Sequence, residues 1–197
     1  MMTFRQRLLR SLYPVYQAVA RLTGRHRKVL HREPAVTPPA SLYDLELTLS
    51  NGERLPLSRF RGRKLLLVNT ASNCIYTSHY ETLRELEARS IGLAIIAFPA
   101  NDFKEQEQGS DAEIGAFCRT AFSISFPVAR KAPVLPGADQ QAVYRWLTDP
   151  AQNGWNSQAP TWNFAKYLVD EQGRLTHYFD PAITPDSDAV IQAMERR

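Results

Sequence analysis

The chain has 197 residues with 24 basic and 20 acidic side chains, which gives a formal net charge of +4. This length fits one globular domain with an appendage, and two cysteines are too few for a disulfide framework or a Cys-rich zinc module. Residues 1–32 hold eight basic side chains and no acidic one, so the remainder has a net charge of −4. The excess of basic side chains therefore lies in residues 1–32, here called the leader, and does not indicate a nucleic-acid-binding domain.

The leader carries apolar residues at helical spacing between Leu8 and Val19, with arginines among them. Pro14 predicts a kink or restart of any helix there. Arg10 lies inside the apolar stretch, which argues against a cleaved secretory signal. We favour a frayed helix or disordered tail over residues 1–32, and the alternative is a cationic amphipathic segment that contacts anionic lipid.

Prolines at positions 34, 38 and 39 predict a stiff, extended spacer after the leader. The spacer should hold the leader away from the rest of the chain. We therefore expect a basic N-terminal extension with a Pro-rich linker over residues 1–40 and one folded domain over residues 41–197.

Within that domain, strand and helix patterns alternate. Asn51-Gly52 adopts positive φ readily and predicts an N-terminal β-hairpin over residues 42–57. Continuous apolar runs at 64–70 and 93–99 predict strands that are covered on both faces. Helices are predicted at 78–90, 111–121, 140–147 and 189–195, and a second hairpin at 166–179. This order indicates an α/β sandwich with a mixed sheet.

Cys74 lies four residues after the first buried strand and just before a predicted helix. Backbone N–H groups and the helix dipole at such a turn stabilise a thiolate. An isolated cysteine in an intracellular protein is more often a small hydrophobic residue. The strand-to-helix position nevertheless makes Cys74 a candidate reactive thiol, because loops of this kind carry function.

Three blocks of the sequence resemble the glutathione peroxidase family, in that family's order and close to its spacing. They are Asn69–Thr77 around Cys74, Phe98–Ser110 and Trp162–Asp170. The similarity extends from about Leu42 to the C terminus. It implies a thioredoxin-like fold with a mixed central sheet flanked by helices, in agreement with the element order above.

By this resemblance Cys74 would be the peroxidatic nucleophile, with Gln106, Trp162 and Asn163 gathered around its sulfur. Attack of a thiolate on a peroxide oxygen expels an alkoxide or hydroxide, so the site must stabilise anionic sulfur and donate hydrogen bonds to the leaving oxygen. Side-chain amides and an indole N–H can do this without adding charge. We expect no metal ligand and no cofactor-binding residue.

Cys118 lies on the helix predicted at 111–121, which Ser110 and Glu113 would cap. It resembles the resolving-cysteine position of thioredoxin-dependent family members, although it could instead pack as an interior residue. In the resolving role it would condense with a Cys74 sulfenic acid to form a disulfide. A disulfide needs Cα atoms within about 7 Å, so the helix should unwind locally during the cycle.

Departures from the family pattern fall near the expected site. Asp102 stands where the family commonly has Gln, and a carboxylate close to Cys74 would disfavour its thiolate. Lys104-Glu105 replaces a glycine-bearing pair in the same loop. His79 is expected on a helix surface with no role, and the insertion at 149–161 has no assigned role.

The resemblance implies an antioxidant thiol peroxidase that reduces hydrogen peroxide and organic or lipid hydroperoxides. Thioredoxin or glutathione would be the external thiol reductant, with no resident cofactor. We expect a cytoplasmic monomer without a nucleic-acid partner, and membrane contact through residues 1–32 stays open. Two alternatives are a peroxide sensor that passes oxidation to a partner protein and a membrane-apposed thioredoxin-like binding module that lacks catalysis.

Overall fold

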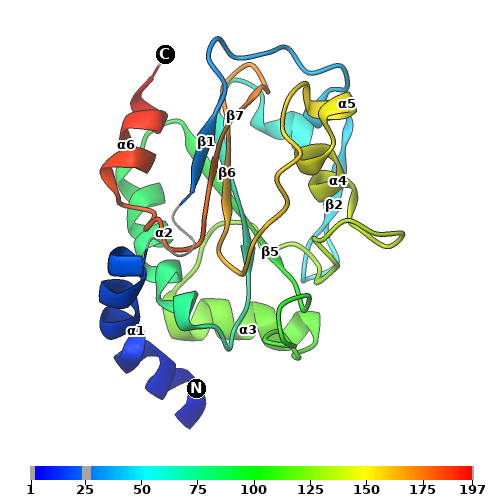
Figure 1. The fold of residues 1–197 in the computed structure, drawn as a ribbon. Helices are drawn as coiled ribbons and strands as arrows, with labels where there is room; N and C mark the ends of the chain where they lie inside the picture. The colour runs from blue at the N-terminus through cyan, green and yellow to red at the C-terminus, as the bar shows by residue number, and fades with distance from the viewer. Residues whose placement is uncertain (1–2, 24–27, 197) are drawn as a thin grey trace.

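The computed structural model describes residues 3–23 and 28–196, and its centre is a five-stranded mixed sheet (Figure 1). The strands of this sheet are β1 (Val29–His31), β4 (Lys64–Thr70), β5 (Leu93–Pro99), β6 (Lys166–Val169) and β7 (Leu175–Phe179). Their spatial order is β1-β7-β6-β4-β5, in which only β4 and β5 are parallel neighbours. A separate hairpin joins β2 (Glu46–Thr48) to β3 (Arg54–Pro56).

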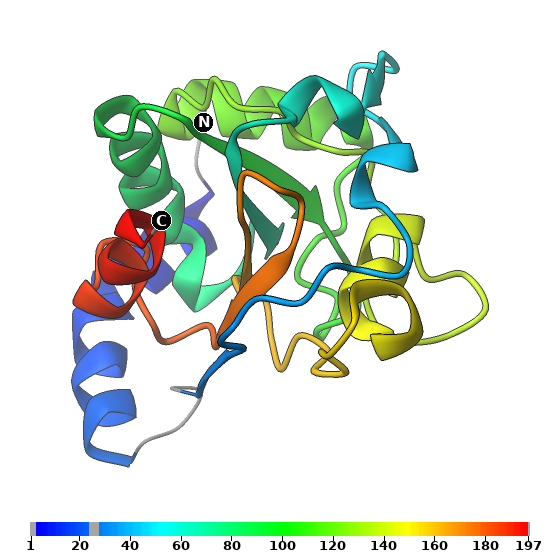
Figure 2. The same ribbon diagram turned by 90° about the horizontal axis from the view of Figure 1, so that it is seen from above.

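Helices cover both faces of the sheet (Figure 2). They are α1 (Phe4–Thr23), α2 (His79–Arg89), α3 (Asp111–Phe122), α4 (Ala142–Thr148), α5 (Pro150–Asn153) and α6 (Asp188–Glu195). Short 3₁₀ turns are η1 (Leu42–Asp44), η2 (Leu57–Phe60) and η3 (Ile75–Ser78). Buried residues of α2, α3 and α6 pack on one face, and those of α4, η1 and η2 pack on the other.

The central strands are apolar throughout because both of their faces are covered. Leu66 and Val68 of β4 join the α2–α3–α6 cluster, while Leu65 and Leu67 join the opposite cluster. Alternate side chains of a strand point to opposite faces, so an uninterrupted apolar run supplies two cores at once. The predicted strands at 64–70 and 93–99 are confirmed, as is the mixed α/β sandwich.

The predicted helices and the second hairpin are also present, with small shifts at their ends, whereas the first hairpin is shorter than predicted because Leu42–Asp44 forms the 3₁₀ turn η1 and β2 is only Glu46–Thr48. Ser110 and Glu113 form the expected capping box at the start of α3. The insertion at 149–161 contains α5 and two buried asparagines that complete the end of α4. Asn153 Nδ2 donates to the Trp146 carbonyl and Asn156 Nδ2 to the Leu147 carbonyl, each at 2.8 Å or less. These amides satisfy carbonyls that the helix leaves open.

The leader is more ordered than the frayed helix or disordered tail that the sequence favours. Phe4–Thr23 is one helix that runs through Pro14, and Val29–His31 is the edge strand of the main sheet. Ordered structure thus begins well before the expected start at residue 41, because α1 and β1 both have packing partners in the body. Arg25 and Arg27 of the basic leader lie outside the described residues.

Candidate active site

Three loops meet at one edge of the sheet. Because β4 and β5 are parallel and Thr70 pairs with Pro99, the loops that follow these strands leave the sheet side by side. The antiparallel strand β6 begins at the same edge, since Lys166 pairs with Val68. The three sequence blocks that resemble the glutathione peroxidase family therefore converge in space.

Cys74 is the N-cap of η3 and is only 1% exposed. The Tyr76 backbone N–H donates to the Cys74 sulfur at 3.4 Å, and the Cys74 N–H donates to Thr77 Oγ1 at 3.1 Å. Thr77 Oγ1 in turn donates to the Ala71 carbonyl at 2.9 Å. These hydrogen bonds fix the turn and place the N-terminal end of η3 next to the Cys74 sulfur.

Three polar side chains predicted for the site lie together beside this thiol. The polar side chains of Trp162 and Asn163 lie close enough to the Cys74 sulfur to favour its thiolate. Asn163 Nδ2 also donates to Gln106 Oε1 at 3.0 Å, and the Gln106 carbonyl accepts from Asn73 N–H at 3.1 Å. The arrangement supplies donors around the sulfur without a charged side chain, and the catalytic roles of the four residues stay a prediction.

Burial controls the resting state of the nucleophile. It raises the pKa of Cys74 to about 12, and the N–H donors of Tyr76, Trp162 and Asn163 only partly offset this rise. At pH 7 such a group is ionised in about one molecule in 10⁵. The resting side chain is therefore a neutral thiol, and its proton must leave as a peroxide enters the site.

Two buried polar residues, Asn69 and Lys166, form hydrogen bonds with the segment that carries Trp162 and Asn163. Asn69 Nδ2 donates to the Trp162 carbonyl at 3.0 Å, and Asn69 O accepts from Phe164 N–H. Lys166 Nζ donates to the Phe164 carbonyl at 2.7 Å, where Phe164 has a left-handed φ of 69°. Burial lowers the pKa of Lys166 to about 7. Lys166 was not among the predicted site residues, although a lysine within an otherwise apolar strand is a signal that the sequence carries.

Cys118 lies on the inner side of α3, and both cysteines are free thiols in one hydrophobic cluster. Burial raises the pKa of Cys118 to about 11, while the Tyr80 side chain next to it favours the thiolate. Cys118 and Gly115 line a surface cavity of about 260 Å³ beside the loop at Ser50. The helix around Cys118 is intact, so its resolving role stays a prediction.

Glu107 is a second residue that the sequence analysis missed. Its carboxylate accepts from the Ser72 N–H at 2.8 Å and from Ser72 Oγ at 3.0 Å, and it is 1% exposed. Burial raises the pKa of Glu107 to about 7, and its charge raises the pKa of Cys118. Its position next to Gln106 in the second block was the available signal.

One expectation about a neighbouring residue differs from the structure, and another is untested. The Asp102 carboxylate accepts from Val134 N–H at 3.1 Å, and its effect on the Cys74 thiolate stays a prediction. His79 is buried instead of lying on the helix surface, because α1 covers it. The Tyr13 hydroxyl shares a short hydrogen bond with His79 Nε2.

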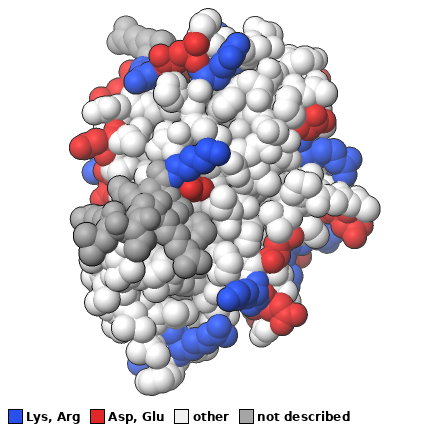
Figure 3. Space-filling view, viewed as in Figure 1, with Lys and Arg blue, Asp and Glu red and all other residues white. Residues whose placement is uncertain are grey.

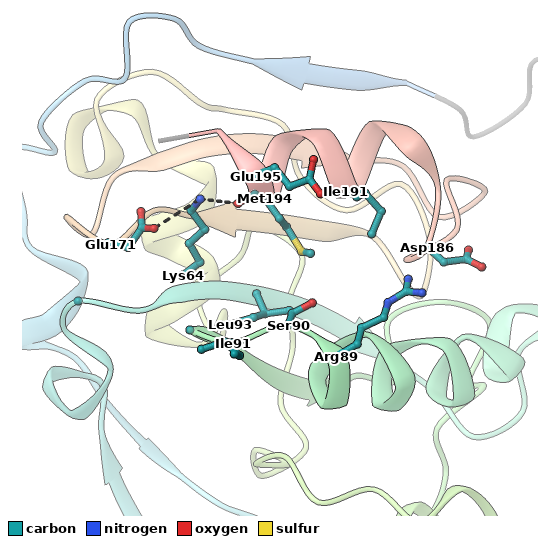
Figure 4. Close-up of a pocket in the computed structure, with 12 residues that line it drawn as sticks. Lys64, Arg89, Ser90, Ile91, Leu93, Glu171, Asp186, Ile191, Met194 and Glu195 are labelled. Atoms are coloured by element: carbon teal, nitrogen blue, oxygen red, sulfur yellow. Dashed lines mark hydrogen bonds and ion pairs between the residues drawn. The ribbon is translucent and has the colours of Figure 1, made fainter.

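A larger cavity of about 620 Å³ lies at the other end of the sheet (Figure 4). It is lined by residues from the starts of β4 and β5, including Lys64 and Leu93, and by Ile191 and Met194 of α6. On one side of this cavity, Lys64 forms an ion pair with Glu171 and donates a hydrogen bond to the Met194 carbonyl. Cys74 follows the opposite end of β4, so this cavity is separate from the thiol site.

The fold and the site together define a class of protein. A thioredoxin-like sheet presents one buried thiol at a strand-to-helix turn, surrounded by uncharged hydrogen-bond donors. This is the arrangement of a thiol-dependent oxidoreductase whose substrate receives hydrogen bonds as it reacts.

Comparison with known proteins identifies the family. The glutathione peroxidase family profile matches residues 42–148. The chain is 33% identical over 160 residues to glutathione peroxidase homolog BsaA of Bacillus subtilis, covering 79% of this chain and 99% of that protein. It is 35% identical over 157 residues to glutathione peroxidase-like peroxiredoxin 2 of Saccharomyces cerevisiae, covering 78% and 96%.

Solved structures agree with this assignment. The crystal structure of T. cruzi GPX1 superposes with a TM-score of 0.59 at 27% identity, covering 78% of this chain and 92% of that one. The chain belongs to the glutathione peroxidase family, and it is a peroxidase-class oxidoreductase with a thioredoxin-like fold. The resemblance to this family is thereby confirmed.

Proposed function

We propose that the protein reduces hydrogen peroxide and organic or lipid hydroperoxides through Cys74. The sulfur attacks one peroxide oxygen, the O–O bond breaks, and the products are a Cys74 sulfenic acid and water or an alcohol. The thiol proton ends on the departing oxygen, so atoms and charge balance. The observation that carries the proposal is the position of the Trp162 and Asn163 side chains beside a buried Cys74 sulfur, where they favour its thiolate.

The neutral donors act mainly on the transition state. As the O–O bond breaks, negative charge moves from sulfur to the departing oxygen. Hydrogen-bond donors next to the sulfur can then stabilise the charge on that oxygen. Gln106 orients Asn163, because its Oε1 accepts one N–H of the Asn163 amide. Burial keeps the resting thiol protonated, which protects it from oxidants that cannot enter the site.

For the second half of the cycle, we propose that Cys118 attacks the sulfenic sulfur, forms a disulfide and releases water. Thioredoxin or glutathione then reduces the disulfide through an external thiol. The cavity beside Cys118 supports access to this thiol from the α3 side. Because Cys118 is held in an intact helix, α3 must open locally before the bond can form.

A peroxide sensor is the second candidate, in which the oxidised Cys74 passes its oxidation to a partner protein. Both thiols are buried, which slows thiol–disulfide exchange with unrelated proteins. This burial suits a peroxidase and a peroxide sensor equally. Turnover with a thioredoxin system distinguishes them, since a relay accumulates mixed disulfides with its partner and a peroxidase consumes NADPH continuously.

We also propose that the enzyme is a cytoplasmic monomer with peripheral membrane contact through residues 1–32. The basic leader without acidic residues supports this location. Fractionation of cells that express the full chain, with and without a high-salt wash, tests it. Protein that stays in the soluble fraction at low salt would contradict the membrane contact.

Mass measurement of the non-reduced protein after one equivalent of hydroperoxide tests the two-cysteine cycle. We expect loss of two hydrogens and a peptide that links Cys74 to Cys118. The matched variant Cys118→Ser should instead gain one oxygen at Cys74. A stable sulfinic acid in the wild-type protein would refute the resolving role, and an unmodified Cys74 would refute the peroxidase mechanism.

A further inference from the structure

The helix α1 has two chemically different faces. Its exposed face carries an apolar stripe, here called the α1 stripe, in which each side chain is about half exposed or more. Its members are Phe4 (82% exposed), Leu8 (47%), Leu12 (47%), Val15 (63%) and Val19 (52%). These positions recur every three or four residues, so they lie within an arc of about 80° on one side of the helix.

Another side of α1 is attached to the turn that begins at Cys74. The Tyr13 hydroxyl is hydrogen-bonded to His79, and the Tyr16 hydroxyl accepts from the Tyr76 hydroxyl at 2.9 Å. The rings of Tyr16 and Tyr76 also meet edge to face at 5.2 Å. The helix is therefore fixed to the active-site edge of the sheet (Figure 1), while Leu8, Leu12 and Val15 of the α1 stripe stay about half exposed or more.

Charge identifies what the α1 stripe can bind. The helix contains no Asp or Glu, and Arg5 and Arg7 are exposed beside the stripe. Below the atoms drawn in grey, the lower left of Figure 3 shows uncharged atoms with basic atoms at the lower edge. Apolar side chains flanked by arginines match the interface of an anionic bilayer, where the former enter the acyl boundary and the latter meet phosphates.

The helix is suited to lie on a bilayer and not to cross it. Among the described parts of the chain, no helix combines the length and the apolar character that a membrane span requires. In a helix that lies flat, the α1 stripe faces the lipid while Tyr13 and Tyr16 face the protein.

We propose that the α1 stripe docks on anionic lipid bilayers and holds the Cys74 edge of the sheet beside the membrane surface. The docking itself depends only on α1, whereas its catalytic consequence rests on the proposed peroxidase function. Because Tyr16 and Tyr76 join the docking helix directly to the turn after Cys74, bound protein keeps its thiol close to the lipid headgroups. Peroxides that arise in the bilayer then reach the site without crossing bulk water.

Sedimentation of the full chain with lipid vesicles tests the proposal. We expect binding to vesicles of phosphatidylcholine with 30% phosphatidylglycerol, weaker binding to pure phosphatidylcholine, and loss of binding at high salt. The triple variant Leu8→Gln, Leu12→Gln, Val15→Gln should reduce binding about tenfold or more. Ile91→Gln is the matched control, since Ile91 is a fully exposed apolar residue outside α1 and its replacement should leave binding unchanged.

Several results would overturn the proposal. They are no binding to anionic vesicles, equal binding to neutral vesicles, or binding that the triple variant retains. If the triple variant instead abolishes a concentration-dependent dimer of the wild-type protein, the α1 stripe binds a second copy. The double variant Arg5→Gln, Arg7→Gln provides an independent arm that leaves the apolar side chains in place, and it should also weaken binding.

Hydrogen peroxide turnover of the same proteins separates this proposal from the proposed function. The triple variant changes exposed residues away from Cys74, so its turnover of this water-soluble substrate should match the wild type. Wild-type protein that binds vesicles but lacks turnover would refute the peroxidase function and support docking. Wild-type protein that turns over hydrogen peroxide but does not bind vesicles would refute docking alone.

Discussion

The Tyr76 hydroxyl donates a 2.9 Å hydrogen bond to the Tyr16 hydroxyl, across 60 residues of sequence. Tyr76 is fully buried and follows Cys74 by two positions, whereas Tyr16 belongs to the basic leader. This bond makes the leader part of the active-site edge and not a tethered tail. The environment of the thiol thus depends on a segment that precedes the residues matched by the glutathione peroxidase profile.

Replacement of the two tyrosines tests how strongly the leader is coupled to the turn. Tyr16→Phe and Tyr76→Phe should each lower the free energy of unfolding by about 1 kcal/mol, because each leaves one hydroxyl of the pair without its partner. The double variant should lose less than the sum, with a coupling of about 0.5 kcal/mol or more. Urea unfolding of the four proteins measures this cycle.

Leu12→Ala is the control for this cycle, because it truncates an exposed side chain of the same helix. Its free energy of unfolding should stay within about 0.5 kcal/mol of the wild type. Strictly additive effects of the two tyrosine variants would show that α1 is not attached through this bond.

The indole of Trp162 gives a second prediction, on catalysis. Trp162→Phe removes the indole N–H, which favours the Cys74 thiolate, but keeps an aromatic ring next to Phe103. We expect kcat/KM for hydrogen peroxide to fall about 10²-fold, since a donor to developing charge is lost. The pH dependence of Cys74 alkylation should also shift upward, because the thiolate loses one hydrogen bond.

Trp155→Phe is the matched control for the loss of an indole N–H. Trp155 Nε1 donates to the Leu175 carbonyl at 2.7 Å, away from the thiol site. Its replacement should affect stability and leave kcat/KM and the alkylation profile unchanged. Equal losses of kcat/KM in both variants would indicate a general folding defect and contradict a specific role for Trp162.

Local sequence patterns were enough to predict most of the fold. The apolar runs at 64–70 and 93–99 can bury their side chains only in a sheet that is covered on both faces. The Ser110–Glu113 capping box locates the start of a helix to within a few residues. The convergence of Cys74, Gln106, Trp162 and Asn163 was predictable through family resemblance. Parallel strands and the start of an antiparallel neighbour then bring the loops together.

The contacts of the leader could not be predicted in the same way. An amphipathic helix has an apolar face, but its sequence does not say which surface covers that face. In this protein Tyr13 and Tyr16, which lie outside the α1 stripe, contact the buried residues His79 and Tyr76. That choice depends on a tertiary contact between distant segments, so the sequence alone favoured a solvent-exposed tail and a surface histidine.

The loop after β5 gives a prediction about backbone strain. Glu105 has a φ of 52° and is exposed, and a left-handed φ is costly for a residue with a Cβ. Glu105→Gly should therefore raise the free energy of unfolding by about 1 kcal/mol. Gln108→Gly in the same loop is the control and should lower stability, since Gln108 has no positive φ to relieve. Destabilisation by both variants would contradict strain at Glu105.

The buried carboxyl of Glu107 gives a prediction about pH. Burial raises its pKa to about 7 from an ordinary value of 4.5. Between these pH values the folded protein keeps a proton that the unfolded chain has lost. The contribution of Glu107 to stability is therefore complete below pH 4.5 and is lost as the pH rises through 7.

Glu107→Gln isolates this contribution, because its amide is neutral at every pH and its oxygen can still accept from Ser72. The free energy of unfolding of the wild type, relative to this variant, should fall by about 2 kcal/mol between pH 5 and pH 8. Glu113→Gln is the control. Hydrogen bonds from Ser110 lower the pKa of Glu113, so this carboxyl is ionised throughout the range and its difference from wild type should be flat. A flat difference for Glu107→Gln as well would mean that Glu107 is already ionised in the folded protein at pH 5.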